Sequence, residues 1–189
     1  MSESPTLVYA HVHDGVRKEY RTQLAGAYNI FNIASAIAVG EHFGVSNEKI
    51  HAAICAYAPD NNRSQIKHTD RNTLIMDAYN ANPTSLEFAL EALSKQSANK
   101  KYFVIGDMLE LGEMGPAEHR HIIEVAQRLG LNGILVGPIF GSIWKEGDYP
   151  VFENNVAAKT YLEAQAMSDH VVLIKGSRGI KLEEVVSAL

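Results

Sequence analysis

The feature that most constrains this fold is an alternation of short apolar runs with longer amphipathic segments, from residue 73 onward. The runs are continuously apolar, which is typical of strands buried on both faces of a sheet. They predict strands at residues 74–76, 101–105, 133–136 and 171–174. The intervening segments predict helices at residues 84–95, 116–129, 139–145, 155–166 and 181–188. This order favours an α/β fold with a doubly wound, mostly parallel sheet.

Residues 1–60 follow a different pattern. Residues 6–24 alternate as two strands, and Asp14-Gly15 between them is a strong signal for a hairpin turn. Two helices are expected next, over residues 26–44 and 46–58. A hairpin and two helices have too little core to fold alone. We therefore expect residues 1–60 to be the end of a larger domain whose beginning is absent.

The polar stretch Asp60-Asn61-Asn62-Arg63-Ser64 marks the expected boundary, so that residues 61–189 form the α/β domain. The chain has 189 residues, a net charge of −5 and one cysteine. The negative charge argues against nonspecific nucleic-acid binding, and a single cysteine cannot form an internal disulfide. No apolar stretch approaches the roughly 18 residues of a membrane span, and no signal-peptide pattern is present. We expect a cytoplasmic protein without membrane insertion.

The segment from Met76 to Ser85 carries an unusual density of polar side chains at the end of a predicted strand. Ligands of open α/β sheets bind at the carboxyl ends of strands, where Asp77 could accept hydrogen bonds from ribose hydroxyls. Tyr79, Asn80 and Asn82 could orient a polar substrate. Asn82-Pro83 also predicts a helix start, with Asn82 as the N-cap. The alternative is that these residues only form a turn.

Two further segments are candidates for ligand contacts. Asn29 and Asn32 are three residues apart and share a helix face, which suggests a contact with the edge of a heterocycle. The alternative is that Asn29 caps the helix and Asn32 is solvent-exposed. The loop Lys175-Gly176-Ser177-Arg178-Gly179 lies between a strand and a helix, and could cradle a carboxylate or phosphate. Its alternative is a glycine-rich turn with solvated cations.

Another candidate segment is the loop that follows the strand expected at residues 101–105, and it contains acidic residues. Asp107 and Glu110 could bind an ammonium group or a metal, but acidic residues are also routine in such loops. Downstream of this loop, His119 is expected to be structural or solvated. His11 and His13 could share a strand face, but no third ligand beyond Asp14 is evident. We predict no metal site.

Together these motifs resemble the Mur ligases. The resemblance covers nearly the whole chain and rests on Tyr79-Asn80-Ala81-Asn82-Pro83, the loop 106–112 with His119, Lys175-Gly176-Ser177-Arg178, and the segment Gly26-Ala27-Tyr28-Asn29-Ile30-Phe31-Asn32. The last segment is similar to a Gly-x-(His/Tyr)-Asn-x-x-Asn signature near the end of the family's central ATPase domain. The resemblance implies that residues 1–60 end this ATPase domain and that residues 61–189 form a Rossmann-like C-terminal domain.

The resemblance also implies roles for individual residues. Asn29 and Asn32 match positions near the adenine of ATP, Arg63 an arginine at the nucleotide phosphates, and Asp77 the acid that binds the ribose. Positions that face the incoming dipeptide and the γ-phosphate are matched by Tyr79, Asn80, Asn82, Lys175, Ser177 and Arg178. Ala78 departs from relatives that carry Asp or Ser there, so it receives no role.

The family member most similar in these motifs joins D-alanyl-D-alanine to UDP-N-acetylmuramoyl-tripeptide. The resemblance implies ATP-dependent amide formation through an acyl phosphate, in peptidoglycan precursor synthesis. The phosphate-binding loop and most Mg²⁺ ligands are expected in N-terminal domains absent from this sequence, so we predict that the chain is inactive alone. Alternatives are a folylpolyglutamate synthetase, a murein-tripeptide recycling ligase, or a non-catalytic nucleotide-binding module.

Overall fold

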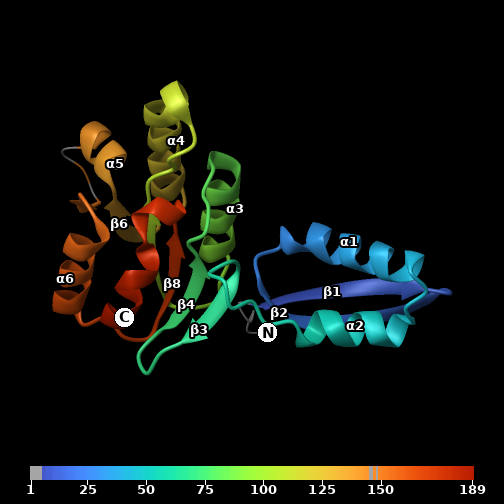
Figure 1. Ribbon diagram of the computed structural model, residues 1–189. Helices are drawn as coiled ribbons and strands as arrows, with labels where there is room; N and C mark the ends of the chain where they lie inside the picture. The colour runs from blue at the N-terminus through green and yellow to red at the C-terminus, as the bar shows by residue number, and fades with distance from the viewer. Residues whose placement is uncertain (1–5, 145–146, 148) are drawn as a thin grey trace.

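The computed structural model describes residues 6–144, 147 and 149–189. Its N-terminal unit is a β-hairpin with two helices. Strands β1 (Thr6–His13) and β2 (Val16–Ala25) pair antiparallel, and helices α1 (Asn29–His42) and α2 (Asn47–Ala56) pack beside them (Figure 1). Asp14 and Gly15 have φ angles of 48° and 75°, which match the hairpin turn expected there. The predicted hairpin and both helices are therefore confirmed.

The second unit is a six-stranded sheet in the order β3-β4-β8-β5-β6-β7. Its strands are β3 (Gln65–His68), β4 (Thr73–Asp77), β5 (Lys100–Gly106), β6 (Asn132–Val136), β7 (Val151–Phe152) and β8 (His170–Lys175). Neighbouring strands are parallel except for β3, which pairs antiparallel with β4 at one edge. The predicted mostly parallel sheet is confirmed, together with its four predicted strands.

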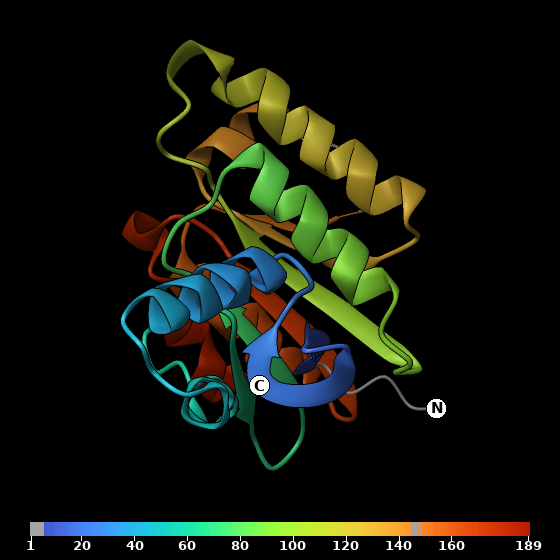
Figure 2. The same ribbon diagram turned by 90° about the vertical axis from the view of Figure 1, so that its right-hand side faces the viewer.

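Helices cover both faces of this sheet. They are α3 (Pro83–Ser94), α4 (Gly115–Arg128), α5 (Pro138–Ile143) and α6 (Asn155–Gln165), with the 3₁₀ segments η1 (Gly112–Met114), η2 (Arg178–Ile180) and η3 (Leu182–Ala188). Helices α3 and α4 lie side by side on one face (Figure 2). Lys145, at the end of the helix expected at residues 139–145, lies outside the described residues. The helix expected at residues 181–188 is 3₁₀ rather than α, and it follows Lys181, whose φ is 54°.

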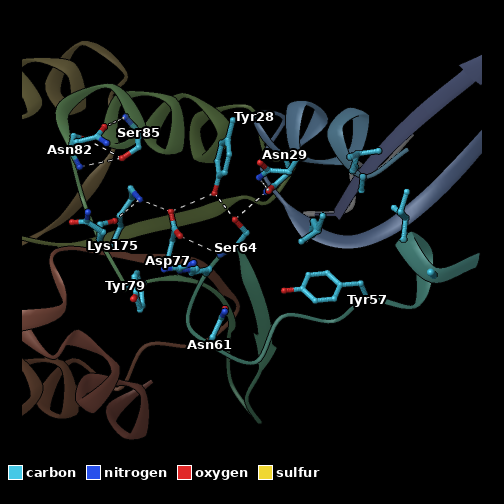
Figure 3. Close-up of a pocket in the computed structure, with 18 residues that line it drawn as sticks. Tyr28, Asn29, Tyr57, Asn61, Ser64, Asp77, Tyr79, Asn82, Ser85 and Lys175 are labelled. Carbon is cyan, nitrogen blue, oxygen red and sulfur yellow. Dashed lines mark hydrogen bonds and ion pairs between the residues drawn. The ribbon is translucent and has the colours of Figure 1, made fainter. Parts of the chain in front are cut away.

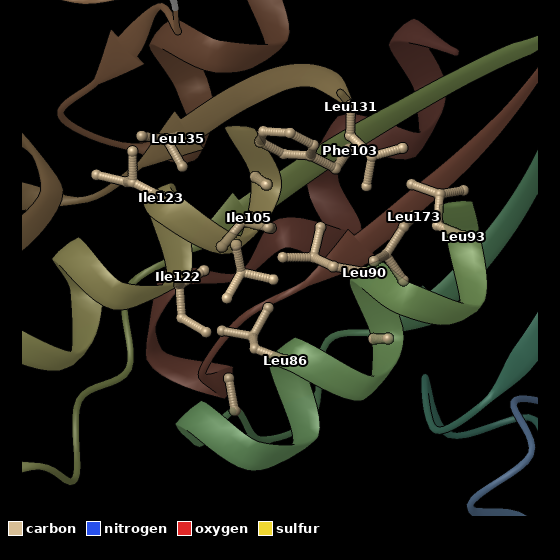
Figure 4. Close-up of a cluster of buried hydrophobic side chains, with 14 of the residues drawn as sticks. Leu86, Leu90, Leu93, Phe103, Ile105, Ile122, Ile123, Leu131, Leu135 and Leu173 are labelled. Carbon is tan, nitrogen blue, oxygen red and sulfur yellow. The ribbon is translucent and has the colours of Figure 1, made fainter. Parts of the chain in front are cut away.

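The alternation of strand side chains divides the core into two layers. Phe103, Ile105 and Leu173 point to the layer under α3 and α4, whereas Val172 and Ile174 point to the layer under α6 and η3. Figure 4 shows the first layer, where leucines of α3 meet isoleucines of α4 over the sheet. The structure has two strands that the sequence pattern did not predict. β3 contains only one apolar residue, and β7 has two residues.

The two units meet at the carboxyl ends of β4 and β8. The backbone N–H of Ala25, at the end of β2, donates to the carbonyl of Ser64, just before β3. This contact places α1 and α2 beside the sheet edge where parallel strands end (Figure 1). In the described part of the chain, no helix is long and apolar enough to cross a membrane.

Candidate functional site

An ion pair between adjacent strand ends forms the centre of the site. Asp77 ends β4 and Lys175 ends β8, and the two residues are register partners in the parallel ladder. Lys175 Nζ donates to Asp77 Oδ2 at 2.5 Å and to the carbonyl of Asn80 at 3.3 Å. The Lys175 side chain is 2% exposed and that of Asp77 is 14% exposed. A buried ammonium requires such a partner, because its desolvation is otherwise costly.

Asp77 also connects the sheet to the N-terminal unit. Its Oδ1 accepts from the backbone N–H of Ser64 at 3.3 Å, and its Oδ2 accepts from the Tyr28 hydroxyl at 3.4 Å. Burial, followed by the negative charge of Asp77, raises the pKa of Tyr28 from 10.0 to about 12. The phenol therefore stays protonated at neutral pH and can donate to the carboxylate.

The two asparagines of α1 extend this network. Asn29 is 4% exposed, and its Nδ2 donates to the Ala25 carbonyl at 2.7 Å and to Ser64 Oγ at 3.0 Å. Asn32 Nδ2 donates to Asn29 Oδ1 at 2.9 Å. Asn29 does not cap the helix, because its Oδ1 accepts from the Asn32 side chain and α1 has no side-chain cap hydrogen bond. Asn32 is exposed and lines the cavity.

A cavity of about 760 Å³ lies between the two units (Figure 3). One end is apolar and lies between α1 and α2, where it is lined by Leu24, Ile33, Ala36, Ala53, Ile54 and Tyr57. The other end is polar and lies at the sheet edge, where it is lined by Arg63, Asp77, Tyr79, Asn80, Asn82, Ser85 and Lys175. Such a cavity suits a ligand with a flat, weakly polar ring at one end and hydroxyl or anionic groups at the other.

Cationic side chains gather at the polar end. The Arg63 guanidinium lies 3.5 Å from the centroid of the Tyr79 ring, and the Arg178 guanidinium lies 5.4 Å from the same ring. Arginine favours aromatic faces because of the ring quadrupole, and it can still bind anions through its N–H groups. The exposed Arg63 and Arg178, with the buried Lys175, provide three positive charges at this edge.

The remaining predicted residues have support roles in the structure. Asn82 caps α3: its side chain accepts from the backbone N–H of Ser85, and the Ser85 hydroxyl accepts from the backbone N–H of Asn82. The predicted helix start is thus confirmed. Asn80 Nδ2 donates to Glu110 Oε2 at 3.2 Å. Ser177 does not line the cavity, and its Oγ accepts from the backbone N–H of Leu109.

Of the two alternatives for Asp107 and Glu110, binding of an ammonium group or a metal and a routine place in the loop, the structure favours the second. Asp107 is fully buried and accepts from the backbone N–H groups of Ile139 and Phe140, at the start of α5. Glu110 instead contacts Asn80. His119 Nε2 accepts from the backbone N–H of Met108 and is fully buried, which gives it the structural role expected. No group of three or more His, Cys, Asp or Glu side chains could hold a metal ion within the described residues.

Of the two interpretations of the glycine-rich loop after β8, the structure does not support an anion cradle that uses the backbone N–H of Ser177. A Cβ on Gly176 would lie 2.9 Å from the Cα of Gly106, so the glycine permits close approach of β8 and β5. Its φ is not positive, and the N–H of Ser177 is used by the carbonyl of Asp107. Glycine is therefore needed here for packing between strands, and side chains supply the positive charge.

Sequence reasoning missed Tyr28, Ser64 and Tyr57. Tyr28 lies inside the Gly26–Asn32 segment, which was a usable signal. In the sequence, Ser64 is only the last residue of the polar boundary at residues 60–64. Nothing in its local sequence indicates that its hydroxyl lies 2.7 Å from the Tyr28 phenol.

A doubly wound sheet whose strand ends border a cavity defines a Rossmann-like α/β fold, a class in which ligands bind at the carboxyl ends of strands. Residues 62–178 match the family described as "Mur ligase, glutamate ligase domain". The chain belongs to the Mur ligase family. A UDP-N-acetylmuramoyl-tripeptide–D-alanyl-D-alanine ligase of Bacillus subtilis (strain 168) is 31% identical over 185 residues, covering 93% of this chain and 40% of the relative. The ligase of the same name from Escherichia coli (strain K12) is 32% identical over 171 residues, covering 88% and 38%.

Solved structures show the same relationship. A crystal structure of MurF from Acinetobacter baumannii matches with a TM-score of 0.84 and 25% identity, over 97% of this chain and 42% of that one. MurF ligase from Thermotoga maritima in complex with ADP matches with a TM-score of 0.78 and 20% identity, over 98% and 43%, which supports the fold alone. The chain spans about 40% of the length of the curated relatives that it matches.

Proposed function

We propose that this chain is the C-terminal portion of an ATP-dependent ligase that joins D-alanyl-D-alanine to UDP-N-acetylmuramoyl-tripeptide. The observation that carries the proposal is the convergence of the α1 amides, the Asp77–Lys175 pair and Arg63 on one cavity of about 760 Å³. The named relatives of the same specificity support it. They favour this function over the alternative amide ligases and over a non-catalytic module.

The cavity suggests how a nucleotide would lie. The base would occupy the groove between α1 and α2 beside Asn29 and Asn32, and the ribose hydroxyls would lie near Asp77. The phosphates would then extend toward Arg63. ATP would supply the phosphoryl group that activates the tripeptide carboxylate, and the amine of the dipeptide would attack the resulting acyl phosphate. Mg²⁺ would be held mainly by groups outside this chain.

The polar end of the cavity would serve the second substrate. Lys175, Tyr79 and Arg178 lie where the dipeptide and the γ-phosphate would meet, and fixed positive charge there stabilises phosphoryl and carboxylate oxygens. Asn80 and Asn82 border the same end. Ser177 would act indirectly, because its hydroxyl holds the loop at Leu109.

Two assays test the proposal. Calorimetry should detect D-alanyl-D-alanine binding by the chain, with a loss in Lys175→Met and no comparable heat from L-alanyl-L-alanine. Equal heats from both dipeptides, or none from either, would contradict the assignment. ATP turnover with UDP-N-acetylmuramoyl-tripeptide and D-alanyl-D-alanine should be absent, since we propose that the catalytic phosphate contacts lie elsewhere. Measurable ligation by the chain alone would overturn that part.

A further inference from the structure

Two histidines, His11 of β1 and His51 of α2, form a hydrogen-bonded pair where α2 packs on the hairpin. His51 is 3% exposed, and both of its ring nitrogens are engaged. Its Nδ1 lies 2.6 Å from the Tyr9 hydroxyl, and its Nε2 lies 2.9 Å from His11 Nδ1. The ring of Tyr20 stacks on that of His51, with centroids 3.9 Å apart. Helix α2 is therefore held to the hairpin through a contact between two titratable rings, called the histidine pair below.

The contact between these two rings has room for one hydrogen only. When both imidazoles are neutral, each carries one N–H, so one of the two facing nitrogens donates and the other accepts. A first added proton is accommodated, because either ring can become the imidazolium and donate to the neutral one. A second added proton directs His11 Nδ1–H and His51 Nε2–H at each other across 2.9 Å, with no acceptor between them. The native geometry therefore admits at most one added proton.

The other side of the His51 ring adapts to either protonation state. Burial raises the pKa of Tyr9 from 10.0 to about 12, so the phenol keeps its hydrogen at neutral pH. Its hydroxyl can donate to His51 Nδ1 when that nitrogen carries no hydrogen, and its oxygen can accept when it does. The limit on the number of protons thus arises between the two histidines and not at Tyr9.

The charged groups around the pair do not remove this limit. Burial lowers the pKa of His51 below its usual 6.5. The carboxylates of Glu41 and Glu48 favour a cation at His51, whereas His13 opposes one. The face of the stacked Tyr20 ring also attracts a cation. These groups influence where the first proton binds, but a second donor at the contact between the rings still lacks an acceptor. Further titratable groups near the pair are Asp14 in the hairpin turn, Lys18 in β2 and Cys55 in α2.

Helix α2 is also a wall of the cavity, which lies beside the sheet (Figure 1). Its residues Ala53, Ile54 and Tyr57 line the apolar end. When the histidine pair separates, α2 keeps the apolar contacts of Ile50 and Ile54 with the hairpin and α1 but loses a hydrogen bond of its buried His51. The shape of the apolar end therefore depends on the protonation of the pair.

We propose that the histidine pair is a pH-sensitive fastening of the N-terminal unit, which holds α2 against the hairpin while it carries at most one added proton and opens when both rings are protonated. The proposal goes beyond the proposed function and does not depend on which ligand the cavity binds.

The size of the effect follows from counting protons. In the unfolded chain both imidazoles titrate near pH 6.5 and bind two protons in acid, whereas the native pair binds at most one. The unfolded state therefore binds one proton more, so the stability from the pair is complete above about pH 6.5 and is lost as the pH falls. The unfolding constant of α2 should rise about tenfold for each pH unit below about 6.5, or about 30-fold between about pH 7.5 and about pH 5.0.

NMR on the 189-residue chain tests the proposal directly. The ¹⁵N signals of the imidazole nitrogens distinguish a neutral ring from an imidazolium, and the backbone amide signals of α2 report whether the helix is native. We expect no more than one imidazolium in the pair as long as the α2 signals are native. The native signals should weaken as the second ring becomes protonated. Urea unfolding followed through the same amide signals measures the unfolding constant at each pH.

A pair of variants separates this contact from general acid sensitivity. His11→Asn leaves a single imidazole, which can bind its proton with Nδ1 donating to Tyr9 and Nε2 donating to the introduced amide oxygen. Its pH dependence should be smaller than that of the wild-type chain by about threefold or more. His68→Asn is the matched control, because His68 is exposed on β3 and contacts Thr73 in the sheet unit. It should retain the wild-type pH dependence.

Three results would overturn the proposal. The first is two imidazolium rings in the wild-type pair at about pH 5.0 with native α2 signals, a readout that requires no variant. The second is an unfolding constant of α2 in the wild-type chain that stays unchanged over the same pH range. The third is a folded His11→Asn whose pH dependence equals that of the wild-type chain.

Discussion

Replacing Lys175 with methionine should destabilise the sheet domain. Methionine keeps most of the side-chain volume but removes the ammonium that donates to Asp77 Oδ2 at 2.5 Å. The Asp77 carboxylate, 14% exposed, would then remain without its cation. The variant tests whether this pair is part of the folded structure as well as of the proposed site.

The expected cost follows from burial and from the remaining partners of Asp77. Removing one partner of a buried ion pair typically costs about 3–5 kcal/mol. Asp77 keeps the hydrogen bonds from Ser64 and Tyr28 and some contact with water, so we expect about 2–3 kcal/mol, at or just below the lower limit of that range. The double variant Asp77→Asn/Lys175→Met should cost less than the sum of the single changes by about 1–3 kcal/mol.

Urea unfolding followed by the fluorescence of Trp144, the single tryptophan, measures these values in the sheet domain. The slope of free energy against urea should not change, so that the midpoint reports stability. Lys159→Met is the matched control, because its 4.0 Å pair with Glu163 is exposed and should contribute less than about 0.5 kcal/mol. A Lys175→Met midpoint indistinguishable from that of the control would refute the reasoning.

Three further predictions concern single side chains. The pKa of Tyr28 rises from 10.0 in the unfolded chain to about 12, so its contribution to stability is complete below pH 10 and is lost between pH 10 and 12. Tyr28→Phe should therefore remove an absorbance change at 295 nm near pH 12. If the variant instead loses a transition near pH 10, the phenol is exposed and the reasoning is wrong. Asp107→Ala removes the carboxylate that accepts from two backbone N–H groups of α5, and it should lower the free energy of unfolding by about 2–4 kcal/mol in thermal or urea unfolding. A cost under about 0.5 kcal/mol, the range of an ordinary surface substitution, would show that these two hydrogen bonds are dispensable. Gly176→Ala should lower the free energy of unfolding by about 1–3 kcal/mol, because its Cβ meets the backbone of β5. The control Gly141→Ala, whose Cβ lies in open space within α5, should be neutral or stabilising. Equal stability of the two variants would argue against the close contact between β8 and β5.

Local patterns in the sequence were sufficient for most of the architecture. Continuous apolar runs and helical spacing depend on neighbours within a few residues, so they predicted the hairpin, the α-helices and the four central strands. The Asn82 cap was predictable for the same reason, since its partner Ser85 is three residues away. Strand β3, with one apolar residue, and the two-residue β7 carry too little pattern to predict, because each is defined by pairing with a distant strand.

The candidate site, like the fold, could be predicted from the sequence only in part. The sequence placed Asp77 and Lys175 at strand ends, and parallel topology brings such ends to one edge of a sheet. Only the tertiary structure showed that they pair with each other, that Asp107 turns instead to α5, and that Ser64 connects α1 to β4. Periodicity reports which face of an element is buried, whereas a hydrogen bond between residues 28, 64 and 77 depends on where separate elements meet. The sequence alone therefore determined which elements form and which loops carry polar groups, and the packing of the two units decided which of those groups meet in one cavity.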